Sequence, residues 1–563
     1  MAQAVVTEAS QQTEQQPKPY PRVFSLRFSG VGMWFAALFF AFSLFPSLLP
    51  RAGYVQGIAS GITIMIGYGI GAGGHALWRF LEVPTPRPSR ARVIKAVLLG
   101  LVGLAVASAV WQYVGWQNEV RNIFGKPSIS PSTWPVIVAV TVLVAGLILI
   151  VARSLRKLAV FATRLLGKWL PPRLAQTISL AVVVVLVWLL VTGVLVNGFF
   201  TAANAMFAPR DSATTAGTVP TTSTLRSGGP ESLVSWESLG RKGRDFVATG
   251  PTVEQIDSFS GGGAVEPIRV YVGLDTEPTL QGRADLLLAE LQRTGAFDRQ
   301  VLVVATTTGT GFLDPAGVDP LEYMFNGDTA IAGVQYSFLP SWISLLADQD
   351  AVKETSRVVF DTVHDYWSTL PEDSRPDLYL YGLSLGSFGV ESVLSSINLV
   401  NEPIDGAFMS GPPFVNLLHD EIEANRDPGS PAWLPAFEDG RTVQFTSSGS
   451  QIDAVVGSAW GPARLVYLQH SSDPVVFFSQ NLALEEPDWL KPGQRGPDIP
   501  DEMTWVPLVT MWQVALDLPA AGSVPTGHGH MYSKQSNAEA WAAMTRPKGW
   551  TAADTAALVA HMD

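Results

Sequence analysis

The segment Asp377-Leu-Tyr-Leu-Tyr-Gly-Leu-Ser-Leu-Gly-Ser-Phe-Gly389 decides the fold of the carboxyl-terminal half of the chain. An apolar strand leads directly into Gly382-x-Ser384-x-Gly386, and a helix is predicted after it. So short a strand-to-helix reversal strains the backbone of the serine, and the flanking glycines leave it room. The pattern predicts an exposed hydroxyl on Ser384, with the N–H of Leu385 as the first donor to an oxyanion.

A serine nucleophile needs a base, and the base needs an acid that orients it. The predicted strand Arg464–Gln469 ends in His470-Ser-Ser-Asp473-Pro474, which places a carboxylate just past the carboxyl end of a strand. We predict Asp473 as the acid, with Asp453 as the alternative. An Asp before a Pro is also common in turns, so a purely structural role is the alternative interpretation of Asp473.

The base is expected in Gly527-His528-Gly529-His530, a glycine-flanked loop near the carboxyl terminus. Both histidines follow a glycine, so the sequence does not choose between His528 and His530. A His-x-His pair can also bind a metal ion, but no third ligand is spaced nearby. We therefore expect neither a metal nor a cofactor.

A second oxyanion donor is expected in the loop Thr306-Thr-Thr-Gly-Thr-Gly311, where Thr308 and Gly309 offer backbone N–H groups next to small residues. A phosphate-binding loop is the competing interpretation. The lysine that such a loop requires is absent, and Phe312 follows the last glycine.

Short β-rich runs alternate with helical stretches from about Ser238 onward, which predicts an α/β domain with a mostly parallel, doubly wound sheet. The predicted strands are Ile268–Gly273, Gln300–Ala305, Ala332–Phe338, Leu378–Gly382, Gly406–Met409 and Arg464–Gln469. The predicted helices include Arg283–Thr294, Ala351–Leu370 and Asn537–Met544.

The amino-terminal part of the chain differs from the remainder in net charge, which indicates that the two parts lie in different environments. Of 563 residues, 47% are hydrophobic and none is cysteine, which excludes disulfides and thiol chemistry. Residues 1–210 hold 18 of the 37 Lys and Arg and 4 of the 49 acids, so they carry +14 and the remainder carries −26. A domain with a net charge of −26 lacks the basic surface that binds the phosphates of nucleic acid, so we expect no nucleic-acid partner.

Five apolar stretches before Arg210 are near the ~20 residues that span a bilayer, which predicts a helical bundle of about five spans. They are Val31–Leu49, Tyr54–Leu77, Val93–Val114, Trp134–Val151 and Thr177–Phe200. Lys and Arg concentrate in the amino-terminal tail and in the second and fourth connections. The positive-inside rule then predicts a multi-pass plasma-membrane protein with a cytoplasmic tail and everything after Phe200 outside.

These features divide the chain into four predicted regions. Residues 1–30 form the cytoplasmic tail, 31–207 the transmembrane domain, 208–237 a flexible linker rich in Thr, Ser, Gly and Pro, and 238–563 the α/β domain. Two stretches rich in Pro, Trp and charge, 414–442 and 480–504, are predicted to cap the site. Trp433, Trp489 and Trp505 would then line it, although packing within the domain explains them equally well.

The chain resembles the membrane-bound α/β-hydrolase family of actinobacteria, in which a multi-span region precedes an extracytoplasmic hydrolase-like domain. The resemblance rests on the Ser384 elbow and on six further segments: 240–246, 267–273, 335–342, 410–414, 429–435 and 527–530. It implies a serine-hydrolase mechanism in which Ser384, Asp473 and either His528 or His530 act together. It does not name a substrate.

We therefore expect a membrane-anchored serine hydrolase of the carboxylic-ester type. Its substrate would be a lipid or cell-envelope acyl group, handled through an acyl-enzyme. An acyltransferase with the same triad is one alternative. Another is a non-catalytic membrane scaffold for envelope assembly, and lipid transport by the spans is a third, weakened by the near absence of ionisable residues within them. The oligomeric state is left open.

Overall fold

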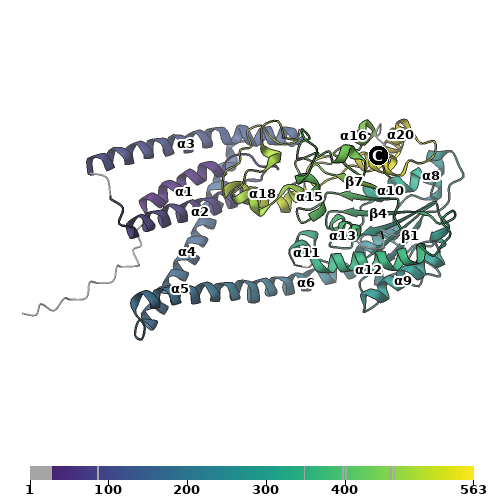
Figure 1. Cartoon of the computed structure of the whole chain (residues 1–563), viewed down its shortest axis with the longest axis horizontal. Helices are drawn as coiled ribbons and strands as arrows, with labels where there is room; N and C mark the ends of the chain where they lie inside the picture. The colour runs from purple at the N-terminus through teal and green to yellow at the C-terminus, as the bar shows by residue number, and fades with distance from the viewer. Residues whose placement is uncertain are drawn as a thin grey trace, which may run out of the picture.

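The computed structural model describes residues 28–562 apart from 85–87, 348, 396–398, 400–401, 456–459 and 462. The chain forms a bundle of long apolar helices at one end and an α/β domain at the other (Figure 1). Helices α1–α6 make up the membrane domain, and residues from about 213 onward make up the hydrolase domain.

The hydrolase domain is built on a seven-stranded sheet in the order β1-β3-β2-β4-β5-β7-β6, and every pair of neighbouring strands is parallel. The strands are β1 Ile268–Val272, β2 Val301–Thr306, β3 Thr329–Val334, β4 Asp377–Leu383, β5 Gly406–Ser410, β6 Val443–Thr446 and β7 Arg464–Leu468. The strand that carries the nucleophile motif, β4, lies in the centre. This confirms the predicted parallel α/β sheet.

Helices cover both faces of this sheet. One face carries α9 (Leu280–Arg293), α12 (Gln349–Trp367) and α13 (Leu385–Leu394), with the short α11 (Ser341–Ala347) before α12. The other face carries α8 (Val253–Ser260), α10 (Pro315–Met324), α16 (Ser450–Val455), α19 (Lys534–Thr545) and α20 (Ala552–Met562) (Figure 1). The remaining α-helices are α7 Gly240–Ala248, α15 Leu417–Ala424, α17 Pro474–Phe477 and α18 Val509–Asp517.

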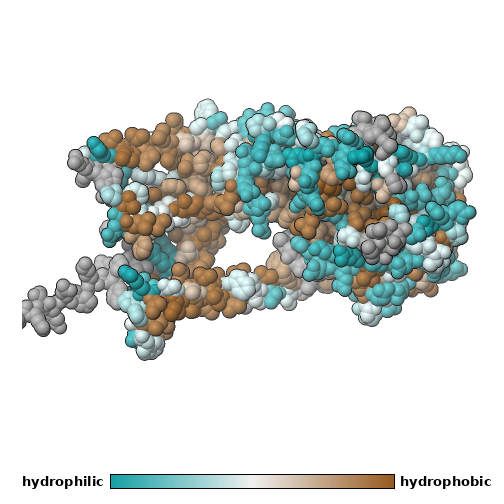
Figure 2. Space-filling view, in the orientation of Figure 1, coloured by the Kyte–Doolittle hydropathy of each residue, from teal (hydrophilic) through white to brown (hydrophobic). Residues whose placement is uncertain are grey.

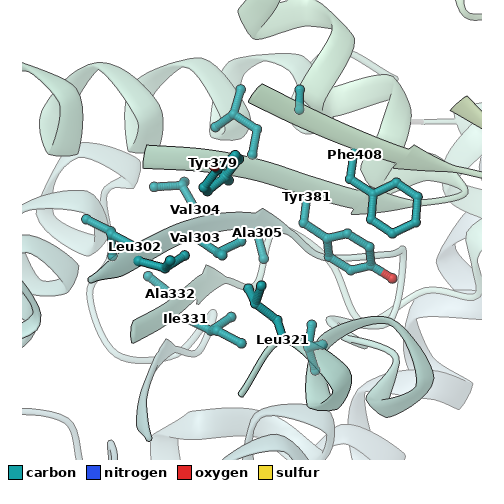
Figure 3. Close-up of a cluster of buried hydrophobic side chains, with 14 of the residues drawn as sticks. Leu302, Val303, Val304, Ala305, Leu321, Ile331, Ala332, Tyr379, Tyr381 and Phe408 are labelled. Carbon is teal, nitrogen blue, oxygen red and sulfur yellow. The ribbon is translucent and has the colours of Figure 1, made fainter. Parts of the chain in front are cut away.

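The core of the hydrolase domain lies between the sheet and these helices (Figure 3). The strands β2, β3 and β4 are buried on both faces, which explains why their sequences are almost continuously apolar. Tyr381, Phe408 and Trp541 pack their rings together at centroid distances of 5.3–5.9 Å. These contacts fix β4 and β5 beneath the site described below.

Two strands differ from the sequence prediction. The predicted strand Ala332–Phe338 begins earlier, at Thr329, and ends at Val334. The edge strand β6 was not predicted, because it has only four residues and follows a segment rich in Pro and charge. The other five predicted strands lie within one or two residues of their observed bounds.

The membrane domain consists of α1 Gly30–Ser43, α2 Gly53–Phe80, α3 Pro88–Ile123, α4 Trp134–Leu166, α5 Pro172–Leu189 and α6 Asn197–Ser212, with a π-helical turn joining the last two. Within the described residues, four helical segments are long and apolar enough to cross a membrane. The first predicted stretch forms a helix of only 14 residues, so the count of five spans stays a prediction. Apolar side chains cover the outer surface of these helices (Figure 2).

The glycines of α2 allow two neighbouring helices to approach closely. A Cβ atom on Gly67 would lie 2.6 Å from the carbonyl oxygen of Phe35 in α1, and one on Gly57 would lie 2.6 Å from Cβ of Val140 in α4. The glycines of α2 therefore serve packing between helices of the same chain.

The segment predicted as a flexible linker is anchored to the hydrolase domain. The N–H of Ser227 donates to the carbonyl oxygen of Arg269 (3.1 Å), and the N–H of Arg269 donates to the carbonyl oxygen of Leu225 (3.3 Å). These bonds cover the exposed edge of β1. Helix α6 also continues to Ser212, past the predicted domain boundary.

The membrane domain and the hydrolase domain share a hydrophobic core, which we call the junction core. The connection after α1 contributes Leu48 and Leu49, the last turn of α3 contributes Val120, and Phe124 follows directly after α3. The cap segment (residues 474–533) contributes Trp489, Leu490, Met503, Val514 and Val524, among others. The carboxyl edge of the sheet, where the cap segment lies, therefore faces the membrane domain.

Candidate functional site

Ser384 occupies the predicted elbow between β4 and α13. Its φ of 56° and ψ of −123° lie outside the regions that side-chain-bearing residues favour, and its N–H donates to the carbonyl oxygen of Ser410 (2.8 Å). A Cβ atom on Gly386 would lie 2.3 Å from the carbonyl oxygen of Thr306, and one on Gly382 would lie 2.3 Å from the backbone of Gly386. The turn therefore has no space for side chains at either glycine.

The structure brings Asp473 and His530 together. Nδ1 of His530 lies 2.6 Å from Oδ2 of Asp473, and the Asp473 side chain is fully buried. The other carboxylate oxygen accepts a hydrogen bond from the N–H of Val475 (2.8 Å), so the residue also caps helix α17. Asp473 therefore both pairs with His530 and shapes the turn before α17.

Ser384 and His530 both lie next to the end of β5, and no hydrogen bond joins the hydroxyl of Ser384 to His530 in the structure. The N–H of Ser384 bonds to Ser410, and the ring of His530 lies against the next residue, where a Cβ atom on Gly411 would approach Cε1 of His530 to 2.6 Å. Nε2 of His530 is buried and has no hydrogen-bond partner among the described residues. Both side chains line the same cavity, and apo structures often show such serine–histidine pairs before they tighten.

Asp473 remains ionised despite its burial. Burial alone would raise the pKa of this carboxyl group, but the charge of His530 and the hydrogen bonds from His530, Tyr532 and Val475 outweigh it, so the pKa lies below its usual value. The hydroxyl of Tyr532 donates to Oδ2 of Asp473 (2.7 Å). A carboxylate held in this way fixes the tautomer of the histidine with Nε2 free for the serine.

His528 points elsewhere. Its ring lies 4.9 Å from the ring of Phe124 at the end of α3, and its Nδ1 lies 3.4 Å from Oδ1 of Asp498. His528 therefore belongs to the contact between the hydrolase domain and the membrane domain. Of the two candidate histidines, only His530 reaches Asp473.

The candidate oxyanion donors differ in their present contacts. The N–H of Leu385 belongs to the first turn of α13, where it has no carbonyl partner within the helix, and Leu385 lines the cavity. The N–H of Thr308 donates to the carbonyl oxygen of Phe312 (3.0 Å), and that of Gly309 donates to Oγ of Ser341 (3.2 Å). Either would have to exchange this partner for an oxyanion, so the second donor stays a prediction.

The cavity above Ser384 has a volume of about 1120 Å³ and a mainly apolar lining. Its walls come from the β2 loop, α11, the β5 and β7 loops, and the segment from α18 to α19. The cap tryptophans Trp433, Trp489 and Trp505 are not among the lining residues, since they pack in or against the junction core. The side chain of Asp453, the alternative acid, lies outside the described residues.

Two residues of the site were not predicted from sequence. Tyr532 lies in the segment that supplied the histidines, but its role depends on the distant Asp473. Asp314 lines the cavity and precedes a proline at the start of α10, so in the sequence it is indistinguishable from an ordinary helix cap. Among the described residues, no group of three or more His, Asp or Glu is arranged to hold a metal ion.

A parallel sheet with a serine elbow after its central strand, followed along the chain by a buried aspartate and a histidine bonded to it, defines an α/β-hydrolase architecture. Comparison with protein families agrees. The profile of the alpha/beta-hydrolase family matches residues 268–558, and that of the alpha/beta-hydrolase family N-terminus matches residues 44–251. The chain belongs to this family, as its motifs predicted. Neither a curated protein nor a solved structure matches it.

Proposed function

We propose that this protein is a membrane-anchored, extracytoplasmic serine hydrolase that cleaves a lipid or cell-envelope acyl ester or thioester through an acyl-enzyme. The observation that supports this most is the convergence of three groups on one apolar cavity: the strained Ser384, the buried Asp473, and His530 with an unpartnered Nε2. Only a serine hydrolase or an acyltransferase needs this set.

In the proposed reaction, Oγ of Ser384 attacks the carbonyl carbon while Nε2 of His530 accepts its proton. The N–H of Leu385 stabilises the negative charge on the tetrahedral oxygen. Collapse of this intermediate breaks the ester bond, and His530 returns the proton to the leaving alcohol or thiol. Water, or an acceptor hydroxyl in the case of acyl transfer, then attacks the acyl-serine by the same steps.

The placement of the basic residues supports the proposed orientation. The α1–α2 and α3–α4 connections contact the hydrolase domain, through Arg51 in the first and Lys126 in the second. The opposite helix ends hold the larger groups of Lys and Arg, which favour the cytoplasmic side. This arrangement supports an amino terminus in the cytoplasm and a hydrolase domain outside.

Labelling with a fluorophosphonate probe tests the proposal. The full-length protein in detergent should be labelled, Ser384→Ala should not be, and His530→Gln should be labelled at least about a hundredfold more slowly because the serine loses its base. Ser392→Ala, about two turns further along α13, is the matched control, since among the described residues its hydroxyl bonds only to the carbonyl oxygen of Gly389. Equal labelling of the wild type and Ser384→Ala would overturn the proposal and leave a tethered binding domain.

A further inference from the structure

The catalytic cavity has two arms of different chemistry, one on each side of the sheet. The apolar arm is lined by Trp342 and Leu345 of α11 together with Leu385, Phe414 and Phe478. The polar arm is lined by Asp314 at the start of α10 and by Ser533, Lys534 and Gln535 at the start of α19. Because α11 lies on the α12–α13 side and α10 and α19 cover the opposite face (Figure 1), the residues that line the two arms come from opposite sides of the sheet.

The apolar arm is continuous with the last membrane helix. The ring of Trp342 is half exposed (48%) and lies 6.1 Å from the ring of Phe199 in α6. The next residue of α11, Ile343, joins a cluster with Ala203 and Phe200 of α6. At the inner end, the rings of Phe414 and Phe478 pack edge to face at 4.8 Å. An alkyl chain lying in this arm would pass from the surface of a membrane helix to the nucleophile.

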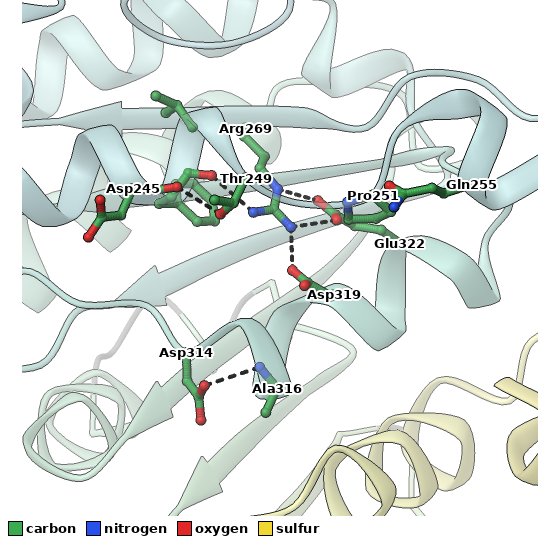
Figure 4. Close-up of polar contacts among 12 residues, drawn as sticks. Asp245, Thr249, Pro251, Gln255, Arg269, Asp314, Ala316, Asp319 and Glu322 are labelled. Atoms are coloured by element: carbon green, nitrogen blue, oxygen red, sulfur yellow. Dashed lines mark hydrogen bonds and ion pairs between the residues drawn. The ribbon is translucent and has the colours of Figure 1, made fainter. Parts of the chain in front are cut away.

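In the polar arm, most of the side chains already have partners within the protein. Gln535 donates to Glu539 (2.9 Å), the hydroxyl of Ser533 bonds to that of Ser536 (2.8 Å), and Nζ of Lys534 donates to the carbonyl oxygen of Met562. Asp314 differs. One of its oxygens accepts from the N–H of Ala316 (3.1 Å), and no hydrogen bond from a described residue reaches the other (Figure 4).

Electrostatics also separates Asp314 from an ordinary helix cap. Burial raises its pKa to about 6, the nearby Asp319 adds to this, and the charge of His530 opposes it. The carboxyl group is thus mainly ionised at neutral pH and within electrostatic reach of the catalytic histidine. An ionised carboxylate with an open oxygen accepts hydrogen bonds.

We infer that the substrate is an amphiphilic ester whose alcohol part carries free hydroxyl groups, and that Asp314 binds one of them. The acyl chain lies in the apolar arm and the hydroxylated alcohol in the polar arm, so that the ester carbonyl sits between them at Ser384. Lys534 in the same arm disfavours a cationic head group, which selects neutral hydroxyls, as in a partial glyceride or a sugar ester. This inference rests on the proposed serine-hydrolase function and names its substrate class.

Two esters of the same acyl chain test the assignment: 1-monolauroylglycerol, which has two free hydroxyls, and propyl laurate, which has none. The wild-type protein in detergent should prefer the glyceryl ester in kcat/KM by about tenfold or more, the range of one hydrogen bond to a charged group. In Asp314→Asn this preference should fall toward unity, because an effect of the lost charge on His530 acts on both esters and cancels in the ratio of their kcat/KM values. Asparagine still caps a helix, so α10 is retained.

Asp373→Asn serves as the matched control, since Asp373 is exposed in the loop before β4, at the amino edge of the sheet. An unchanged preference in Asp314→Asn, or an equal loss on both esters, would overturn the role of Asp314. A larger effect of this variant on lauroylcholine than on the glyceryl ester would mean that Asp314 binds a cationic head group and not a hydroxyl. That result would overturn the substrate class. Absence of turnover together with absence of fluorophosphonate labelling would instead refute the proposed function itself.

Discussion

Arg51 of the membrane domain and Asp517 of the hydrolase domain form an ion pair that is sealed from solvent. Nε of Arg51 lies 3.1 Å from Oδ1 of Asp517, and each side chain is 1% exposed. The other carboxylate oxygen accepts from the hydroxyl of Ser47 and from the N–H of Leu49. Burial raises the pKa of Asp517, and Arg51 together with these hydrogen bonds opposes the shift. The α1–α2 connection is thereby fixed to the end of α18.

Removal of one partner from this pair should weaken the contact between the two domains. We expect Asp517→Leu or Arg51→Met to destabilise the full-length protein by about 3–5 kcal/mol, because a buried charge is left without a partner. The measurement is thermal unfolding in detergent. The double variant should recover part of the loss, since no lone charge remains; single variants that unfold at the wild-type temperature would show that the pair contributes little.

The two histidines of the Gly527–His530 loop should have different roles, His530 in catalysis and His528 in stability. His530→Ala should reduce esterase activity by about three or more orders of magnitude, as expected when the base of a triad is removed. His528→Ala should keep most of the activity and lower the thermal stability instead, because its ring packs against Phe124. Activity measured beside unfolding temperature distinguishes the two. Loss of activity in a folded His528→Ala would contradict this assignment.

The elbow glycine Gly386 should not tolerate alanine. Its Cβ would approach the carbonyl oxygen of Thr306 to 2.3 Å, and backbone at the end of β2 cannot move aside cheaply. We expect Gly386→Ala to lose fluorophosphonate labelling. Gly146→Ala in α4, where nothing lies within 4 Å of the new atom, should label like the wild type. Normal labelling of Gly386→Ala would mean that the elbow is looser than its geometry indicates.

Asp314 should lower the stability of the folded protein as pH rises, whereas an ordinary ion-paired acid raises it. Because its folded pKa of about 6 exceeds the ordinary value of 3.8, the folded state binds more protons between these values, and the free energy of unfolding falls as pH rises from about 4 to 6. Asp314→Asn removes this cost.

The Asp314→Asn variant should therefore unfold at a higher temperature than the wild type above pH 6, by a few degrees, and the difference should vanish near pH 4. Thermal unfolding over this range measures it. A wild type and variant that differ by the same amount at every pH would place the pKa of Asp314 in its usual range.

The fold and most of the candidate site could be predicted because their signals are local. The elbow needs only two glycines around a serine after an apolar strand, and Asp473 follows a strand directly. The choice between His528 and His530 has no local signal. It is decided by contacts with Phe124 and Asp473, which are distant in sequence.

Asp314 and the cap tryptophans show the same limit. An Asp-Pro at a helix start is common whether or not a cavity lies beside it, and only the tertiary arrangement places Asp314 near His530. The sequence predicts that these tryptophans either line the cavity or pack within the domain, because their segments are rich in Pro, Trp and charge. Trp489 is instead buried in the junction core, against side chains from the membrane domain that no sequence pattern connects to it.

The junction core has a practical consequence for the chain as a whole. A fragment that begins after α6 would keep every strand of the sheet and all three members of the candidate triad. It would also leave the junction core without Leu48, Leu49, Val120 and Phe124. Such a fragment should aggregate when expressed alone, and replacing the helical bundle with an unrelated anchor should fail for the same reason.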